Sequence, residues 1–217
     1  MEHRDCEVLI IKPTPVFFSS FKAEHPLAYS SVALPLPEDN TAYTLWKTST
    51  EDELLEEIET HFQAIYKYEV SRWFGEPEHD EIHISFLDFL CRFKFEFHSQ
   101  VVLMEPSIRA GKQLISIKPR SVFIQWMESA VADKEEQTSI LERLNLARLV
   151  NDSTVVIKNF SDEQESDQFM RHYYHSLLSV ELSRMSNNEE QWPLVESFEA
   201  FNRFFSVETH THLVHLR

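Results

Sequence analysis

The sequence predicts a single α+β domain, in which a mixed antiparallel sheet packs against several long amphipathic helices. Short alternating or apolar runs, typical of strands, are grouped near the two ends of the 217-residue chain. Stretches with apolar residues three and four positions apart, typical of helices, lie between them. Hydrophobic residues make up 42% of the chain and charged residues 26%, as in ordinary globular proteins. The domain is expected to span 1–217, and the pattern also allows a sub-boundary near 105–120.

The first 48 residues contain many prolines, and short apolar runs lie between them. Proline lacks the N–H that a central strand needs, so we expect edge strands, irregular bends and long turns in this part. Over the whole chain, strands are expected at 7–12, 29–34, 41–47, about 92–104, 113–118, 153–160 and 207–216. The chain shows no internal repeat.

Helix signals are strongest after Thr50. Thr50-x-x-Glu53 is a capping box, and the apolar stripe that follows ends at Gly75. A second box, Ser161-x-x-Gln164, predicts another helix up to about Ser186. Further helices are expected from about 78 to 91, in one or two pieces from 121 to 150, and in a short aromatic segment that begins at 192. The spacing of apolar residues in 85–97 fits both a helix and a strand, and we place the change from helix to strand after Cys91. The stripe of the long first helix is expected to face the protein's own core, with a partner groove as the alternative.

Glycine is too scarce for the common nucleotide-binding loops. Gly75 and Gly111 are the two glycines of the chain, whereas a P-loop and a dinucleotide-binding turn need several at fixed spacing so that backbone can approach phosphate. The Gly111–Lys112 pair is followed by Gln113 and lacks the upstream glycine of a P-loop. We therefore expect no cofactor of this kind.

The formal charge of −16 argues against direct contact with nucleic acid or with anionic membranes. No run is long and apolar enough for membrane insertion, and no signal peptide is evident. Cys6 and Cys91 are expected to be buried, reduced thiols, which fits a cytoplasmic protein. A basic or apolar docking surface on another protein is the expected partner.

Charge is unevenly distributed, and this suggests docking residues. Six of the nine residues in 51–59 are acidic, whereas a basic island is expected around the 106–120 turn, with Lys118 as a member. Two tryptophans flank predicted element boundaries and could anchor an interface. The candidate partner-binding residues are Glu56, Glu57, Glu59, Arg109, Lys112, Arg120, Trp46 and Trp192.

Histidine offers the only weak metal signal. The chain has 11 histidines, and His210-x-His212 would place two imidazoles on one face of a strand. A metal site needs one or two further ligands, which the sequence does not identify. No spacing singles out a catalytic triad.

These exclusions favour a non-enzymatic interaction protein: an adaptor, a chaperone or a small subunit of a larger complex. In gross composition alone, the chain resembles small acidic secretion chaperones. A histidine-dependent metal-binding protein or enzyme is one alternative. An acidic nucleic-acid mimic that blocks a DNA-binding protein is another.

Overall fold

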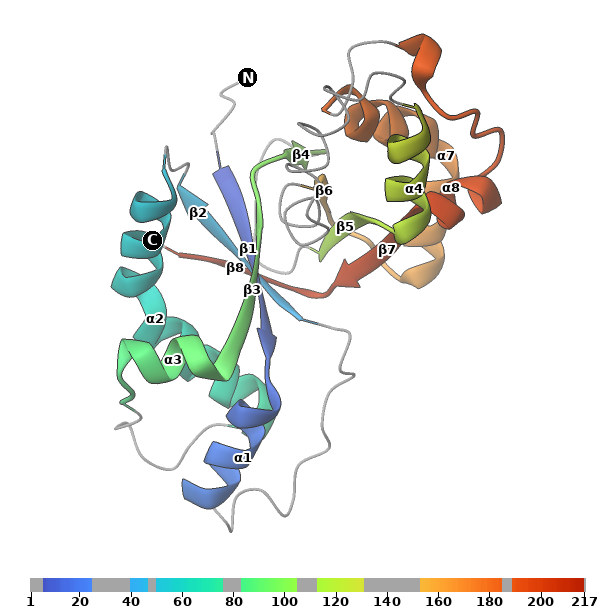
Figure 1. Ribbon diagram of the computed structural model, residues 1–217. Helices are drawn as coiled ribbons and strands as arrows, with labels where there is room; N and C mark the ends of the chain where they lie inside the picture. Colours follow the sequence, from blue (N-terminus) through green and yellow to red (C-terminus); the bar gives the residue numbers. More distant parts are fainter. Residues whose placement is uncertain are drawn as a thin grey trace.

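The computed structural model describes residues 6–24, 40–46, 50–75, 83–104, 113–130, 153–184 and 189–216. Within these ranges the chain forms six α-helices, a single 3-10 turn at Glu189–Gln191 and two four-stranded sheets (Figure 1). The predicted α+β class is confirmed.

The first sheet has the strand order β3-β1-β2-β8. Its strands are β1 (Cys6–Pro13), β2 (Thr41–Trp46), β3 (Phe93–His98) and β8 (His212–His215). β1 pairs antiparallel with both β2 and β3, while β8 runs parallel to β2. Three of the described helices belong to this part of the chain: α1 (Pro15–Glu24), α2 (Glu51–Phe74) and α3 (Phe86–Arg92).

The second sheet has the strand order β4-β6-β5-β7. Its strands are β4 (Val101–Leu103), β5 (Gln113–Pro119), β6 (Val155–Lys158) and β7 (Phe205–His210). β5 pairs antiparallel with β6 and β7, while β4 runs parallel to β6. The described helices of this part are α4 (Ser121–Ala130), α7 (Glu163–Ser183) and α8 (Phe198–Phe204).

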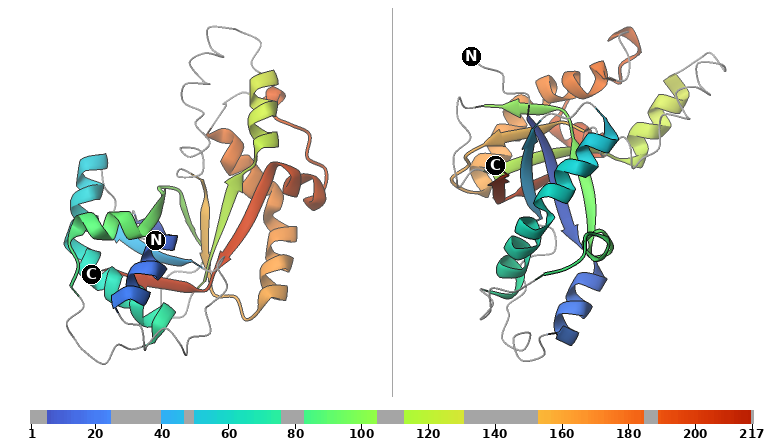
Figure 2. Two further views of the ribbon diagram at one scale, coloured as in Figure 1. Left: turned by 60° about the horizontal axis from the view of Figure 1, so that its bottom comes forward. Right: turned by 90° about the vertical axis from the view of Figure 1, so that its left-hand side faces the viewer.

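The chain crosses directly from one sheet to the other at two places. The chain passes from β3 into β4 through residues 99–100, and from β7 into β8 through Thr211. Each sheet therefore has an edge strand from the opposite half of the chain. Because β3 continues into β4 and β7 continues into β8, the two sheets are joined by the chain at both edges. Figure 2 shows the two sheets facing each other, with the helices on their outer sides.

The two halves repeat one sequence of elements. Among the described residues, the first half runs β1-α1-β2-α2-α3-β3-β4 and the second half runs β5-α4-β6-α7-α8-β7-β8, with the same strand pairings. The second half also has the 3-10 turn at Glu189–Gln191 between α7 and α8. The sequence analysis found no internal repeat, whereas the structure shows a repeated arrangement of elements. The joint between the halves lies within the 105–120 range, but whether the chain is one domain stays a prediction.

Three hydrophobic cores follow from this arrangement. The outer face of each sheet packs against its helices, and these two cores are rich in phenylalanine. A smaller apolar layer lies between the inner faces of the sheets. Its buried members come from both halves: Val8, Ile10, Ala42, Leu114, Val155, Ile157 and Leu213.

Helix caps agree with the sequence in one case and differ by one residue in the other. Thr50 caps α2 by accepting the Glu53 N–H at 3.1 Å, as predicted. Gly75 ends this helix at φ +84°, a backbone angle that glycine adopts without strain. At α7 the cap is Asp162, which accepts from Glu165 N, instead of the predicted Ser161. Aspartate there also places a negative charge at the helix N-terminus.

Several expectations fail near prolines and in the aromatic segments. The sequence analysis missed helix α1, which begins at Pro15. Proline is well suited to the first position of a helix, so it does not exclude one here. β1 is an inner strand rather than an edge strand, since Pro13 lies at its very end. The short aromatic helix begins at Phe198, and Cys91 is exposed. The strand expected at 29–34 and the helices expected at 131–150 lie outside the described residues.

Replacement of Phe89 by alanine should lower the free energy of unfolding by about 3–5 kcal/mol, because this fully buried ring packs against Phe62 and Phe93. Leu87 on the same helix is 71% exposed, so Leu87→Ala should change it by about 0.5 kcal/mol or less. Urea unfolding of the two variants measures both values. Equal effects would contradict the packing described for α3.

Candidate functional site

Polar side chains occupy one end of the space between the two sheets. On β1, β3, β5 and β7, alternate residues such as Ile11, Phe95, Ile117 and Val207 pack into the outer cores, so their neighbours point inward. These inward residues form a group that we call the inter-sheet cluster. Its members are Lys12, Glu96, His98, Ser116, Lys118, Glu208 and His210.

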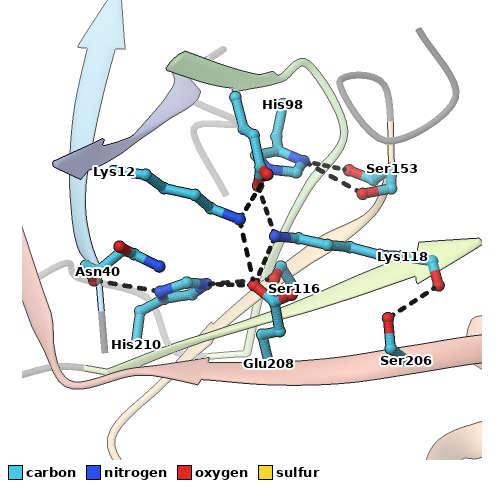
Figure 3. Close-up of polar contacts among 10 residues, drawn as sticks. Lys12, Asn40, His98, Ser116, Lys118, Ser153, Ser206, Glu208 and His210 are labelled. Carbon is cyan, nitrogen blue, oxygen red and sulfur yellow. Dashed lines mark hydrogen bonds and ion pairs between the residues drawn. The ribbon is translucent and has the colours of Figure 1, made fainter. Parts of the chain in front are cut away.

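Four charges in this cluster alternate in sign. Glu96 accepts from Lys12 Nζ and from Lys118 Nζ, each at 2.5 Å. Glu208 accepts from Lys118 Nζ at 2.5 Å and lies 3.6 Å from Lys12 Nζ. Figure 3 shows the two ammonium groups side by side at the centre of the cluster. Each half supplies one lysine and one glutamate, so the net charge is zero and two ion pairs join the halves.

Burial and pairing compete in setting the pKa values of these groups. Burial alone would raise the pKa of Glu96 and of Glu208, but the neighbouring lysines lower both below the ordinary glutamate value. Burial dominates at Lys118, whose pKa is lowered. For Lys12, burial is outweighed by Glu96, and its pKa is raised. The directions of these shifts keep Glu96, Glu208 and Lys12 charged at neutral pH. At Lys118, which is the most buried of the four, contact with both carboxylates at 2.5 Å favours the ammonium form against burial.

Two buried imidazoles flank the four charges. His98 Nδ1 lies 3.0 Å from the Ser153 carbonyl, and His210 Nδ1 lies 3.1 Å from the Asn40 carbonyl. A carbonyl only accepts, so each Nδ1 carries the proton and each Nε2 presents a lone pair. Burial, chiefly, lowers the pKa of both histidines to about 4. They are thus neutral at pH 7.

One imidazole also contacts a hydroxyl group. Ser116 Oγ lies 3.2 Å from His210 Nε2 and donates to it, and Glu208 Oε2 lies 3.9 Å from the same nitrogen. A serine beside a histidine is the geometry of an activated nucleophile. Here both residues are fully buried, so a substrate has no access to them in this conformation. The Ser116–His210 contact lies within the second sheet, between the neighbouring strands β5 and β7, and its burial indicates a structural role.

The corresponding position in the first half differs. Ile10, which pairs with Glu96 as Ser116 pairs with Glu208, stands where the hydroxyl group would be. His98 Nε2 consequently has no hydrogen-bond partner among the described residues. The charged groups and the histidines are common to both halves, whereas the serine is not.

The expected histidine pair does not share a face. His210 points between the sheets, whereas His212 Nδ1 lies 3.2 Å from Tyr68 Oη of α2, on the outer side of the first sheet. The expectation fails because the strand changes sheet at Thr211, which interrupts the alternation. In the described part of the chain, no three His, Cys, Asp or Glu side chains are grouped to hold a metal ion.

The expected docking residues are dispersed over the molecule. Glu56 and Glu59 are exposed on α2, and Glu57 lies 3.4 Å from His61. Trp46 is 62% exposed at the end of β2, whereas Trp192 packs partly against the second core.

The basic island is not a single surface in the described residues. Arg120 is exposed, and its Nε donates to the Phe205 carbonyl at 3.1 Å. Lys118, which the sequence analysis placed on the island, is buried in the inter-sheet cluster. It faces inward because it alternates with Ile117, a core residue. Arg109 and Lys112 lie outside the described residues.

The inter-sheet cluster itself was missed from the sequence. The signal that could have found it is a pair of short motifs present in both halves. Lys-Pro-x-x-Val-Phe occurs at 12–17 and at 118–123, and Glu-x-His occurs at 96–98 and at 208–210. Each motif supplies one inward-facing charge per half.

Comparison with models of known protein families, with curated proteins and with solved structures gives no match for this chain. Across the described ranges, none of the helices has both the length and the hydropathy of a transmembrane span.

Acidification should destabilise the protein through His98 and His210. Their pKa is about 4 when folded and 6.5 ordinarily, so the unfolded chain binds more protons between these values. Stability should therefore fall from pH 6.5 toward pH 4, by about 1.4 kcal/mol per pH unit for each histidine. Urea unfolding at several pH values should show a shallower slope for His98→Gln/His210→Gln than for the unaltered chain.

Comparing slopes separates the histidines from the carboxyl groups. The lowered pKa values of Glu96 and Glu208 act in the same direction, while burial raises the pKa values of Glu69 and Glu181 and acts oppositely. These groups are present in both proteins. The exposed His172→Gln serves as control, and an unchanged slope in the double variant would contradict the assignment.

Lys118→Met should lower the free energy of unfolding by about 2–4 kcal/mol, because it leaves Glu96 and Glu208 with a single ammonium. Adding Glu208→Gln restores charge balance and should recover part of this loss. Lys158→Met removes a surface pair with Glu165 of the same 2.5 Å length, and should cost about 1 kcal/mol or less. Thermal or urea unfolding that ranks Lys158→Met as the more damaging change would refute the structural role of the cluster.

Proposed function

We propose that the chain is a non-enzymatic interaction protein, an adaptor, chaperone or small complex subunit, that binds a basic segment of another protein. The binding surface is the N-terminal part of α2 together with Trp46, and we call it the α2 docking face. Its residues are Trp46, Asp52, Leu55, Glu56 and Glu59.

The exposed tryptophan is the observation that carries this proposal. Trp46 has 62% of its surface exposed, whereas the other three tryptophans of the chain are buried or half-buried, and Leu55 of α2 is 47% exposed. Three residues separate Trp46 from the Thr50 cap of α2, so the chain itself holds the two within about 14 Å. Figure 1 shows the end of β2 beside the beginning of α2. Tryptophan is enriched among residues that dominate binding energy.

Acidic side chains lie on the same first turns of α2 as Leu55. Asp52, Glu56 and Glu59 are exposed on α2, and among the described residues their carboxylates have no cationic partner. An acidic rim around an apolar anchor attracts a basic segment and speeds its encounter. It favours a lysine- or arginine-rich partner over an acidic one.

The structurally equivalent helix, α7, is acidic at other positions, where Glu165 pairs with Lys158 and Asp167 pairs with Arg171. Counted from their caps, Thr50 and Asp162, the positions of Asp52, Glu56 and Glu59 on α2 correspond to three non-acidic residues on α7. These are Gln164, Gln168 and Arg171. The acidic face is thus a feature of one half and is not required by the fold that both halves share.

A triple variant, Trp46→Ala/Glu56→Gln/Glu59→Gln, tests the proposal. Tagged proteins are used to purify partners from the native host, and the affinity of the recovered partner is then measured with purified components. The variant should bind at least ten-fold more weakly, and binding by the unaltered chain should weaken with added salt.

A matched control removes the same number of carboxylates elsewhere. Glu163→Gln/Glu196→Gln acts on exposed residues of the second half and should leave binding unchanged. Two results would overturn the proposal. One is a partner whose affinity is equal for the triple variant and the control, and the other is a chain that purifies alone as a homogeneous species.

A further inference from the structure

Several structurally equivalent positions of the two halves carry the same residue type where the halves contact each other. Lys12 and Lys118 lie 106 positions apart and precede Pro13 and Pro119, which pair with Phe93 and Phe205. Glu96 and Glu208 lie 112 positions apart, as do His98 and His210. The ladder registers thus equate the halves residue by residue.

Equivalence extends into the helices. The buried Glu69 of α2 accepts from Tyr43 of β2 at 2.7 Å, and the buried Glu181 of α7 accepts from the Thr154 N–H beside β6 at 2.5 Å. The short helices α3 and α8 are both capped by serine, Ser85 and Ser197, each at 3.1 Å. Buried and capping groups, which determine a fold, are therefore shared by the halves.

Contacts between the halves are reciprocal. Val101 of β4 pairs with Val155 of β6, and the equivalent Leu213 of β8 pairs with Ala42 of β2. Lys118 of the second half binds Glu96 of the first, and Lys12 of the first half lies 3.6 Å from Glu208 of the second. Such reciprocity is the mark of a two-fold interface between like subunits.

We propose that the chain is an internal dimer: two copies of one folding unit joined in tandem, in which the inner sheet face of each copy is the docking surface for the other. The partner of this surface is thus a second copy of the same unit, held in the same chain. Two-fold equivalence then makes the order of the halves interchangeable.

A connection follows from this equivalence. Residues 105–112 join Met104 to Gln113. The places equivalent to these two residues are Leu216 and Glu7, so the gap from Leu216 to Glu7 should be the same. A connector of eight residues that serves the natural order should therefore also serve the reversed order.

A circular permutant tests this expectation with all the described elements retained. It consists of 113–216, then 105–111, then 6–104, so that eight residues again separate Leu216 from Glu7. We expect it to unfold cooperatively in urea, with the mass of a monomer in light scattering. Lys118→Met should lower its denaturation midpoint by about as much as in the natural order.

A connector series supplies the matched control. The connector is shortened one residue at a time in the natural and the permuted chain, and lengthened with Gly-Ser pairs where a chain fails to fold. The shortest tolerated connector should be the same length in both orders, within one residue. A permutant that folds as a dimer, with the halves paired between chains, also supports the interface. Failure at every length, or folding only with a much longer connector than the natural order needs, would overturn the proposal.

Discussion

Neither half of this chain completes its own sheet. The parallel strand at the edge of each sheet comes from the opposite half. The backbone hydrogen bonds of β2 therefore depend on β8, and those of β6 depend on β4. An unpaired strand edge is costly and adhesive. The exchange of β4 and β8 therefore makes the two halves interdependent. The apolar layer between the sheets also holds the halves together, because it buries residues from both of them.

A charged group in this interface is not the most stable choice available in principle. Apolar residues of similar volume often do as well as a buried ion pair or better. What the four charges add is geometry. Lys118 meets carboxylates from strands of both halves at 2.5 Å, while Lys12 meets Glu96 of its own half at 2.5 Å and lies 3.6 Å from Glu208 of the other half. A shift of one strand by a single residue would turn these groups into the phenylalanine-rich cores. The cluster thus fixes the register in which the sheets face each other.

Sequence patterns were informative where the signal is local. The cap at Thr50, the end at Gly75 and the change from helix to strand after Cys91 all depend on neighbouring residues, and the structure agrees with them. The site was not accessible in this way. Lys12 and Glu208 are nearly the whole chain apart, and an isolated lysine before a proline gives no sign of facing inward. Only the recurrence of Lys-Pro-x-x-Val-Phe and Glu-x-His connects them, and the intervening sequence has diverged too far for that recurrence to stand out.

The parallel pairing of β8 with β2 affects how the protein folds while it is being synthesised. Thr44 Oγ1 lies 2.7 Å from His215 Nδ1, and these residues are 171 positions apart. Contacts that span so much of a chain form slowly, because a large loop has to close first. After β1, β2 and β3 have been synthesised, residues 99–211 still have to be made before β8 can complete the first sheet. Until residues 212–215 have been made, the open side of β2 lacks its parallel strand partner and is exposed to other nascent chains nearby.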